Sequence, residues 1–178
     1  MNLQKLFKAQ AELDKRIVEK KGLQGVDLLP NLILALQVKL GKCANEWRGY
    51  KLWSSRQEPV TEDLRVVDFK RNGEAIIETY NPLLEKYVDC LNFTLSIGLQ
   101  LYNEVISADL YGFRRNNILS QFTTLFYYSS MLSGDYCYWR FFEHLIGLGE
   151  MFGFTYDQIE QVYFEKNDVN HGLLDDGY

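Results

Sequence analysis

The chain has 178 residues, of which 47% are hydrophobic and 15% aromatic, so it is long and apolar enough to bury a core in one domain, 1–178. Its formal net charge of −5 argues against general binding to nucleic acid, so any basic site must be local. No stretch approaches the roughly 18 apolar residues of a membrane span, and the N-terminus lacks the apolar run of a signal peptide. We therefore expect a cytoplasmic protein that binds neither nucleic acid nor membrane.

The cysteines follow neither a metal-binding nor a disulfide pattern. Cys43, Cys90 and Cys137 are widely spaced, and each falls within an apolar helical pattern. An odd number at such spacing indicates neither a zinc site nor a disulfide framework. We expect reduced thiols in the core.

Residues 3–19 are predicted to form an amphipathic helix. Gln10 and Asp14 lie one turn apart on its apolar stripe, where polar groups need partners. An amide and a carboxylate so placed could hydrogen-bond the edge of a base. The residues alone favour the alternative, a buried hydrogen bond between helices or a turn of a dimer interface.

The segment 20–30 contains two glycines and ends in Pro30, which is typical of a connector. Asn31 is expected to open the second helix. That helix should run to about Trp47 and end near Gly49.

Residues 54–80 are predicted to be a long excursion with only short apolar runs. A strand or hairpin is expected from Val66 to Ile77, around an Asn72-Gly73 turn. Loops of this length are often functional lids or dock on a partner chain. Asn81 and Pro82 then predict a helix start, with Asn81 as the N-cap and Pro82 at the first helical position.

The C-terminal half is predicted to hold three further helices. The pattern loosens over 101–115, a fourth helix is expected after Gly112, and Asp135 can cap a fifth, which ends at 152–154. Thr155 and Gln158 form a capping box for the last helix, predicted over 155–167. The expected fold class is all-α, a helical bundle whose long insertion holds one small hairpin.

Two of these helices carry charged residues at i, i+3 spacing. Lys39 and Lys42 lie on the second helix, and Lys86 and Asp89 on the third. Charges are costly to bury unless paired, and three lysines do not balance one aspartate, so a site built from them would take an anion. Periodicity alone favours solvated lysines, with Lys42 paired to Glu46 and Lys86 to Asp89.

Three stretches carry a resemblance to a known family: ALQVKLGKCANEWRGYKLWS, NPLLEKYVDCLNFTLSIGL and YFEKNDVN. In this order they resemble the dimeric all-α dUTPases of bacteria and their phages, which are related to the MazG-type nucleotide pyrophosphohydrolases. The resemblance spans nearly the whole chain. It implies a helical bundle, a homodimer and a nucleotide site.

The resemblance also implies a magnesium site of four carboxylates, arranged as Glu-x-x-Glu and Glu-x-x-Asp. In this chain the four positions are Lys39, Lys42, Lys86 and Asp89. An ammonium group has no lone pair and cannot ligate magnesium, so Asp89 is the only matching ligand retained. Asn92 and Leu173 also stand where the family usually has histidine and arginine.

From the resemblance we expect a catalytically degenerate dUTPase-like protein that binds an anionic nucleotide, or a nucleotide-derived signal, without a cofactor. Such a protein would act as a phage-type nucleotide sponge or a regulatory pseudoenzyme. The residues implied for the nucleotide site are Gln10, Asp14, Lys39, Lys42, Glu46, Trp47, Lys86, Asp89, Asn92, Lys166, Asn167 and Asn170.

Two alternatives remain open at this point. The first is an active magnesium-dependent dUTP diphosphatase, which converts dUTP to dUMP and pyrophosphate, with the metal held by Glu46, Glu85 and Asp89. The second is a protein-interaction module with an empty pocket, in which the excursion 54–80 carries the contact.

Overall fold

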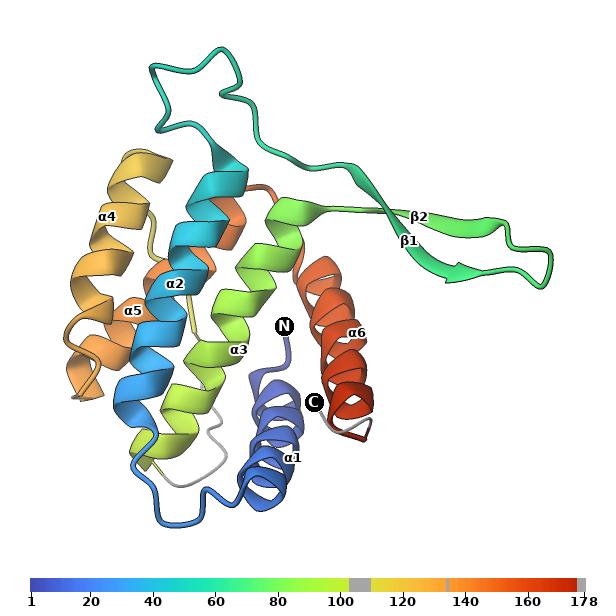
Figure 1. Ribbon diagram of the computed structural model, residues 1–178. Helices are drawn as coiled ribbons and strands as arrows, with labels where there is room; N and C mark the ends of the chain where they lie inside the picture. Colours follow the sequence, from blue (N-terminus) through green and yellow to red (C-terminus); the bar gives the residue numbers. More distant parts are fainter. Residues whose placement is uncertain (103–109, 134, 176–178) are drawn as a thin grey trace.

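The structure, a computed structural model, describes residues 1–102, 110–133 and 135–175. Within them the chain forms six helices and one two-stranded hairpin, so the predicted all-α fold class is confirmed (Figure 1). In chain order the elements are α1 (Leu3–Lys21), α2 (Leu29–Trp47), β1 (Asp63–Phe69), β2 (Ala75–Tyr80), α3 (Pro82–Tyr102), α4 (Ile118–Ser129), α5 (Asp135–Met151) and α6 (Tyr156–Asp175).

Helix α3 is the central element of the bundle. It packs against α1, α2, α5 and α6, and is buried on most of its circumference. Helices α1 and α6 lie side by side on one flank, and α4 and α5 lie on the other (Figure 1). The core joins Leu6, Leu40, Leu91, Phe142 and Tyr163, one from each of five helices. The N-terminal and C-terminal helices therefore close over the same face of α3.

The predicted caps of α3 and α6 are confirmed. The Asn81 side chain accepts a hydrogen bond from the Leu84 amide at 2.9 Å. Gln158 Oε1 accepts from the Thr155 amide at 2.9 Å, and the Gln158 amide donates to Thr155 Oγ1 at 3.2 Å. These reciprocal bonds satisfy amides that a helix N-terminus leaves unpaired.

Three predicted boundaries are wrong. Helix α2 begins at Leu29 rather than Asn31, because proline is tolerated in the first helical turn, where its missing N–H costs nothing. Helix α4 begins at Ile118, where Asn117 caps it, rather than just after Gly112. Helix α6 continues to Asp175 instead of ending at 167. Of the stretch 101–115, residues 103–109 lie outside the described residues.

The hairpin predicted around Asn72-Gly73 is confirmed, and its strands are longer than expected. Strands β1 and β2 pair antiparallel, with a bulge between Val66 and Asp68. Gly73 has φ +82°, which glycine adopts without steric cost. The hairpin projects from the helices rather than packing into their core (Figure 1).

All three cysteines are free thiols. Cys43 and Cys90 are buried in the core, as predicted, whereas Cys137 is only half-buried and lies outside it. Among the described residues, no helix is both long and apolar enough to cross a membrane.

Candidate functional site

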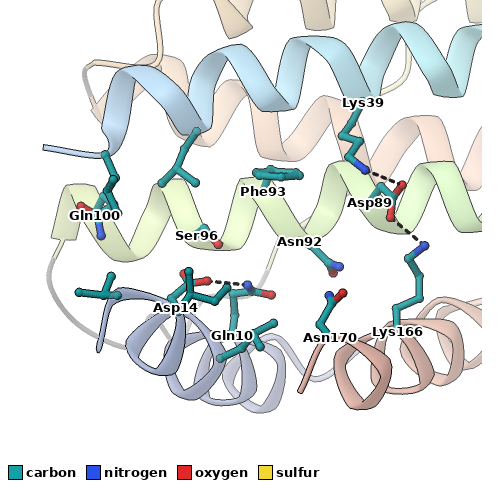
Figure 2. A pocket seen from close by; sticks show the side chains of 15 residues that line it. Gln10, Asp14, Lys39, Asp89, Asn92, Phe93, Ser96, Gln100, Lys166 and Asn170 are labelled. Carbon is teal, nitrogen blue, oxygen red and sulfur yellow. Dashed lines mark hydrogen bonds and ion pairs between the residues drawn. The ribbon is translucent and has the colours of Figure 1, made fainter. Parts of the chain in front are cut away.

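A cavity of about 490 Å³ lies between α1, α2, α3 and α6 (Figure 2). Its apolar walls include Leu13, Ile17, Leu32 and Phe93, which can enclose a ring. Polar side chains gather at two places along it. The remaining lining residues are Gln10, Asp14, Val18, Leu28, Lys39, Asp89, Asn92, Ser96, Gln100, Lys166 and Asn170.

One end of the cavity is charged. Asp89 Oδ2 accepts a hydrogen bond from Lys39 Nζ at 3.1 Å, and Asp89 Oδ1 accepts from Lys166 Nζ at 2.8 Å (Figure 2). Burial alone would raise the pKa of Asp89, but the two ammonium groups lower it below its ordinary value. Asp89 is therefore ionised at neutral pH.

The charges at this end do not cancel. Lys39, Lys166 and Asp89 contribute two positive charges and one negative charge, and their side chains are only 27%, 23% and 11% exposed. Each ammonium group has three donors, of which the carboxylate takes one. This end of the cavity can therefore accept an anion.

The other polar group lies toward the opposite end of the cavity. Gln10 Nε2 donates to Asp14 Oδ1 at 2.8 Å. Tyr163 on α6 places its hydroxyl 3.0 Å from Gln10 Oε1 and 3.1 Å from the Leu6 carbonyl. Burial raises the pKa of Asp14, whereas the hydrogen bonds from Gln10 and Ser96 act in the opposite direction and lower it. Gln10 thus makes an interhelical hydrogen bond and also lines the cavity.

Two buried amide atoms have no hydrogen-bond partner among the described residues, Asn92 Oδ1 and Asn167 Nδ2. A buried polar atom left unpaired costs about 1–3 kcal/mol. Asn92 lies on the cavity wall between the two polar groups (Figure 2). The Asn92 Oδ1 atom is itself covered by protein, so the unpaired oxygen is a local cost in the cavity wall and is not accessible from the cavity.

The other residues of the sequence-based set do not line this cavity. Lys42 is exposed, while Lys86 and Glu46 are half-buried. The Trp47 ring packs on Phe122 of α4, with ring centroids 5.5 Å apart. Lys39, Lys42 and Lys86 therefore do not surround one cavity. Lys166 from α6 joins Lys39 instead.

Ser96 and Gln100 line the cavity but were missed from the sequence. They follow Asp89 on α3 by seven and eleven residues, and Asn92 and Phe93 lie between Asp89 and Ser96. These intervals place all five on one helix face. Continuing the stripe from Asp89 would have found them.

The residues present do not fit the magnesium site implied by the resemblance. Both Asp89 oxygens are taken by ammonium groups, and Glu85 pairs with Arg65 of the hairpin. In the described part of the chain, no group of three or more Asp, Glu, His or Cys side chains could hold a metal ion. Magnesium requires oxygen ligands, which this arrangement does not offer.

No curated protein matches the sequence. A family model described as dUTPase matches residues 2–68 and 74–178, and the gap between the two segments falls at the tip of the hairpin. The match covers every element that lines the cavity. The chain therefore belongs to the all-α dUTPase family.

Proposed function

We propose that this protein binds one anionic nucleotide, or a nucleotide-derived signal, in the cavity and does not hydrolyse it. The observation that carries the proposal is the placement of Asp89 between Lys39 and Lys166, with one positive charge uncompensated. A binder without turnover acts by sequestration, as a nucleotide sponge or a regulatory pseudoenzyme.

The two polar groups of the cavity fix the orientation of the bound nucleotide. The phosphate meets Lys39 and Lys166, and the base lies toward Gln10 and Asp14, against the Phe93 ring. Asp89 and Ser96 are separated by seven residues of α3, which corresponds to about 10 Å. This distance is suited to a sugar between a base and its phosphate.

The cavity also supports a single domain over 1–178. Its walls come from α1 and α2 near the start of the chain, from α3, and from α6 near the end. Neither half of the chain encloses the cavity alone.

Family membership favours a second candidate, a dUTP diphosphatase that releases dUMP and pyrophosphate. It would need Glu46, Glu85 and Asp89 to share a metal. Glu85 and Asp89 are each paired with cations of the chain, so this candidate requires the site to be rebuilt.

The lysines supply the direct test. In the Lys39→Ala or Lys166→Ala variant, loss of a charge-assisted hydrogen bond is expected to cost about 1–3 kcal/mol of binding, or about 5–150-fold in affinity. The measurement is calorimetric titration with dUMP in a chelator, repeated with any nucleotide that mass spectrometry identifies in the heat-denatured protein. Affinity should fall as salt is added.

Lys8→Ala is the matched control, because Lys8 is an exposed lysine on α1 and does not line the cavity. The Lys8→Ala variant should bind the nucleotide with the same affinity as the unaltered protein. Binding that survives both cavity variants, or that requires magnesium, would contradict the proposal.

We also propose that the protein is a homodimer in which the hairpin contacts the second copy. Cross-strand partners share a face, and one face of the hairpin carries Leu64, Val66, Phe69, Ala75, Ile77 and Thr79. This face has no charge, so it can meet its own copy without burying an unpaired ion. An isolated two-stranded hairpin is marginally stable in water.

The groove beside the hairpin adds to that contact area. It measures about 830 Å³, lies between the hairpin and α6, and includes Val66 on one side with Val162 and Val169 on the other. A stable interface buries roughly 800 Å² per partner, so contact beyond the hairpin face would strengthen the dimer. A second copy that contacts the rims of the groove at Val66 and Val169 would leave its inner end, beside Lys166, open to the cavity.

The Val66→Lys variant is expected to shift the protein from dimer toward monomer, because a lysine on this face would be buried unpaired. Val26→Lys is the matched control, since Val26 is 52% exposed and Val66 is 53% exposed. Sedimentation equilibrium at micromolar concentration measures the mass. A mass of 20.9 kDa for the unaltered protein would rule out the dimer.

A further inference from the structure

We infer that the cavity takes a mononucleotide whose phosphate carries one negative charge, a phosphodiester such as that of a 3′,5′-cyclic mononucleotide, in preference to a triphosphate. The inference rests on the proposed function and specifies its ligand. Four observations carry it: the charge balance at Asp89, the acidic groove beyond it, the position of the remaining lysines and the volume of the cavity.

The first observation is the charge balance. Both ammonium groups contact the same carboxylate, at 3.1 Å for Lys39 and 2.8 Å for Lys166. Together these three side chains leave one positive charge at this end of the cavity. Asp14, the other acidic residue among the described lining residues, is bonded to Gln10 and lies away from this end. A partly buried charge is costly when no opposite charge compensates it. A diester balances this end of the cavity, whereas a phosphate monoester brings about −1.5 to −2 and a triphosphate more.

The second observation is the groove outside the charged end. Lys166 and Asn170 line both the cavity and the groove between the hairpin and α6, so a chain of phosphates that passed them would enter the groove. Glu78, Glu85 and Glu165 line it.

The acidic side chains of the groove outnumber its cations. Arg65 is the other cation of the groove besides Lys166, and it is already paired with Glu78 and Glu85. The groove therefore repels additional phosphates, and its described lining residues offer no unpaired cation to neutralise them.

The third observation concerns the lysines that could have extended the site. Lys42 is exposed, and neither it nor Lys86 lines the cavity or the groove. The phosphate would therefore contact the ammonium groups of Lys39 and Lys166 but not those of Lys42 or Lys86.

The fourth observation is the volume of the cavity. About 490 Å³ lies in the lower half of the range for sites that enclose one small ligand.

The test compares ligands that share a base and differ in phosphate charge. The unaltered protein is titrated calorimetrically in a chelator with uridine, uridine 3′,5′-cyclic monophosphate, uridine 5′-monophosphate and uridine triphosphate. If the purified protein releases a nucleotide, the series uses that base instead. The cyclic diester should bind tightest, about 10-fold or more above the triphosphate, which corresponds to one unit of log affinity.

The Asp89→Asn variant tests the charge balance directly. The amide keeps the shape of the side chain and removes its negative charge, so the charged end gains one positive charge. The preference for the diester over the monoester is expected to fall about 10-fold or to reverse. Asp68→Asn, at an exposed position on β1, is the control and should leave the preference unchanged.

Each outcome has a separate meaning. Tighter binding of the triphosphate, or losses in Lys42→Ala and Lys86→Ala as large as in Lys39→Ala, would overturn this inference and leave the proposed function standing. Equal affinity for uridine and the diester, or no binding by any member of the series, would overturn both. The ligand comparison uses the unaltered protein, so it decides the question even if a variant fails to fold.

Discussion

Replacing Gln121 with leucine is expected to lower the free energy of unfolding by about 3–5 kcal/mol. The Gln121 side chain is fully buried on α4. Its Nε2 donates to the carbonyl oxygens of Phe113 at 2.7 Å and His144 at 2.6 Å, and its Oε1 accepts from the Arg115 amide at 2.7 Å. Leucine fills a similar volume but removes all three bonds and leaves backbone groups unpaired.

Chemical denaturation monitored by circular dichroism measures this loss, with the midpoint and the slope compared between variants. Gln4→Leu is the matched control, since Gln4 is exposed on α1, and its effect should stay within about 0.5 kcal/mol. A loss below about 1 kcal/mol in Gln121→Leu would mean that the three bonds are replaced or contribute little.

Gln121 also explains why the start of α4 was misplaced. Its side chain holds residues 113–115 through their backbone, and this requires an irregular segment before the helix. In the sequence Gln121 is one polar residue in an apolar helical stretch. Its partners come from a segment before α4 and from α5, so the hydrogen bonds exist only once the two helices have packed.

The features predicted correctly depend on local chemistry. Asn81 caps α3 three residues from its partner, Thr155 and Gln158 bond across one turn, and Gly73 sits at the tip of its own hairpin. Each of these interactions is complete within a few residues. These features can therefore be predicted from the local sequence without knowledge of the tertiary fold.

The arrangement of the site depends on the tertiary fold and was predicted only in part. Residues three apart on a helix differ by about 60° around the axis, which is enough to point Lys39 into the cavity and Lys42 into solvent. Spacing alone cannot say which of the two faces inward. Lys166 reaches Asp89 because α6 packs beside α3, and no local pattern records that contact.

The second large effect expected is an absence of magnesium-dependent dUTP hydrolysis. Enzymes of ordinary efficiency turn over at roughly 1 per second or faster, and this protein is expected to fall orders of magnitude below that rate. A catalytic magnesium ion must be held by oxygen ligands. Both carboxylate oxygens of Asp89 are already bonded to ammonium groups, one to Lys39 and one to Lys166. Displacing either lysine would leave a partly buried ammonium group beside the incoming cation.

Pyrophosphate release from dUTP, followed with and without a chelator, measures the turnover. The Lys39→Glu variant removes one ammonium group from Asp89 and adds a carboxylate to the cavity, so it should bind magnesium more tightly than the unaltered protein in calorimetry. Turnover near 1 per second that the chelator abolishes in the unaltered protein would establish the diphosphatase instead. In that case Lys166 would have to leave Asp89 when dUTP binds, and Lys166→Ala would raise magnesium affinity rather than weaken nucleotide binding.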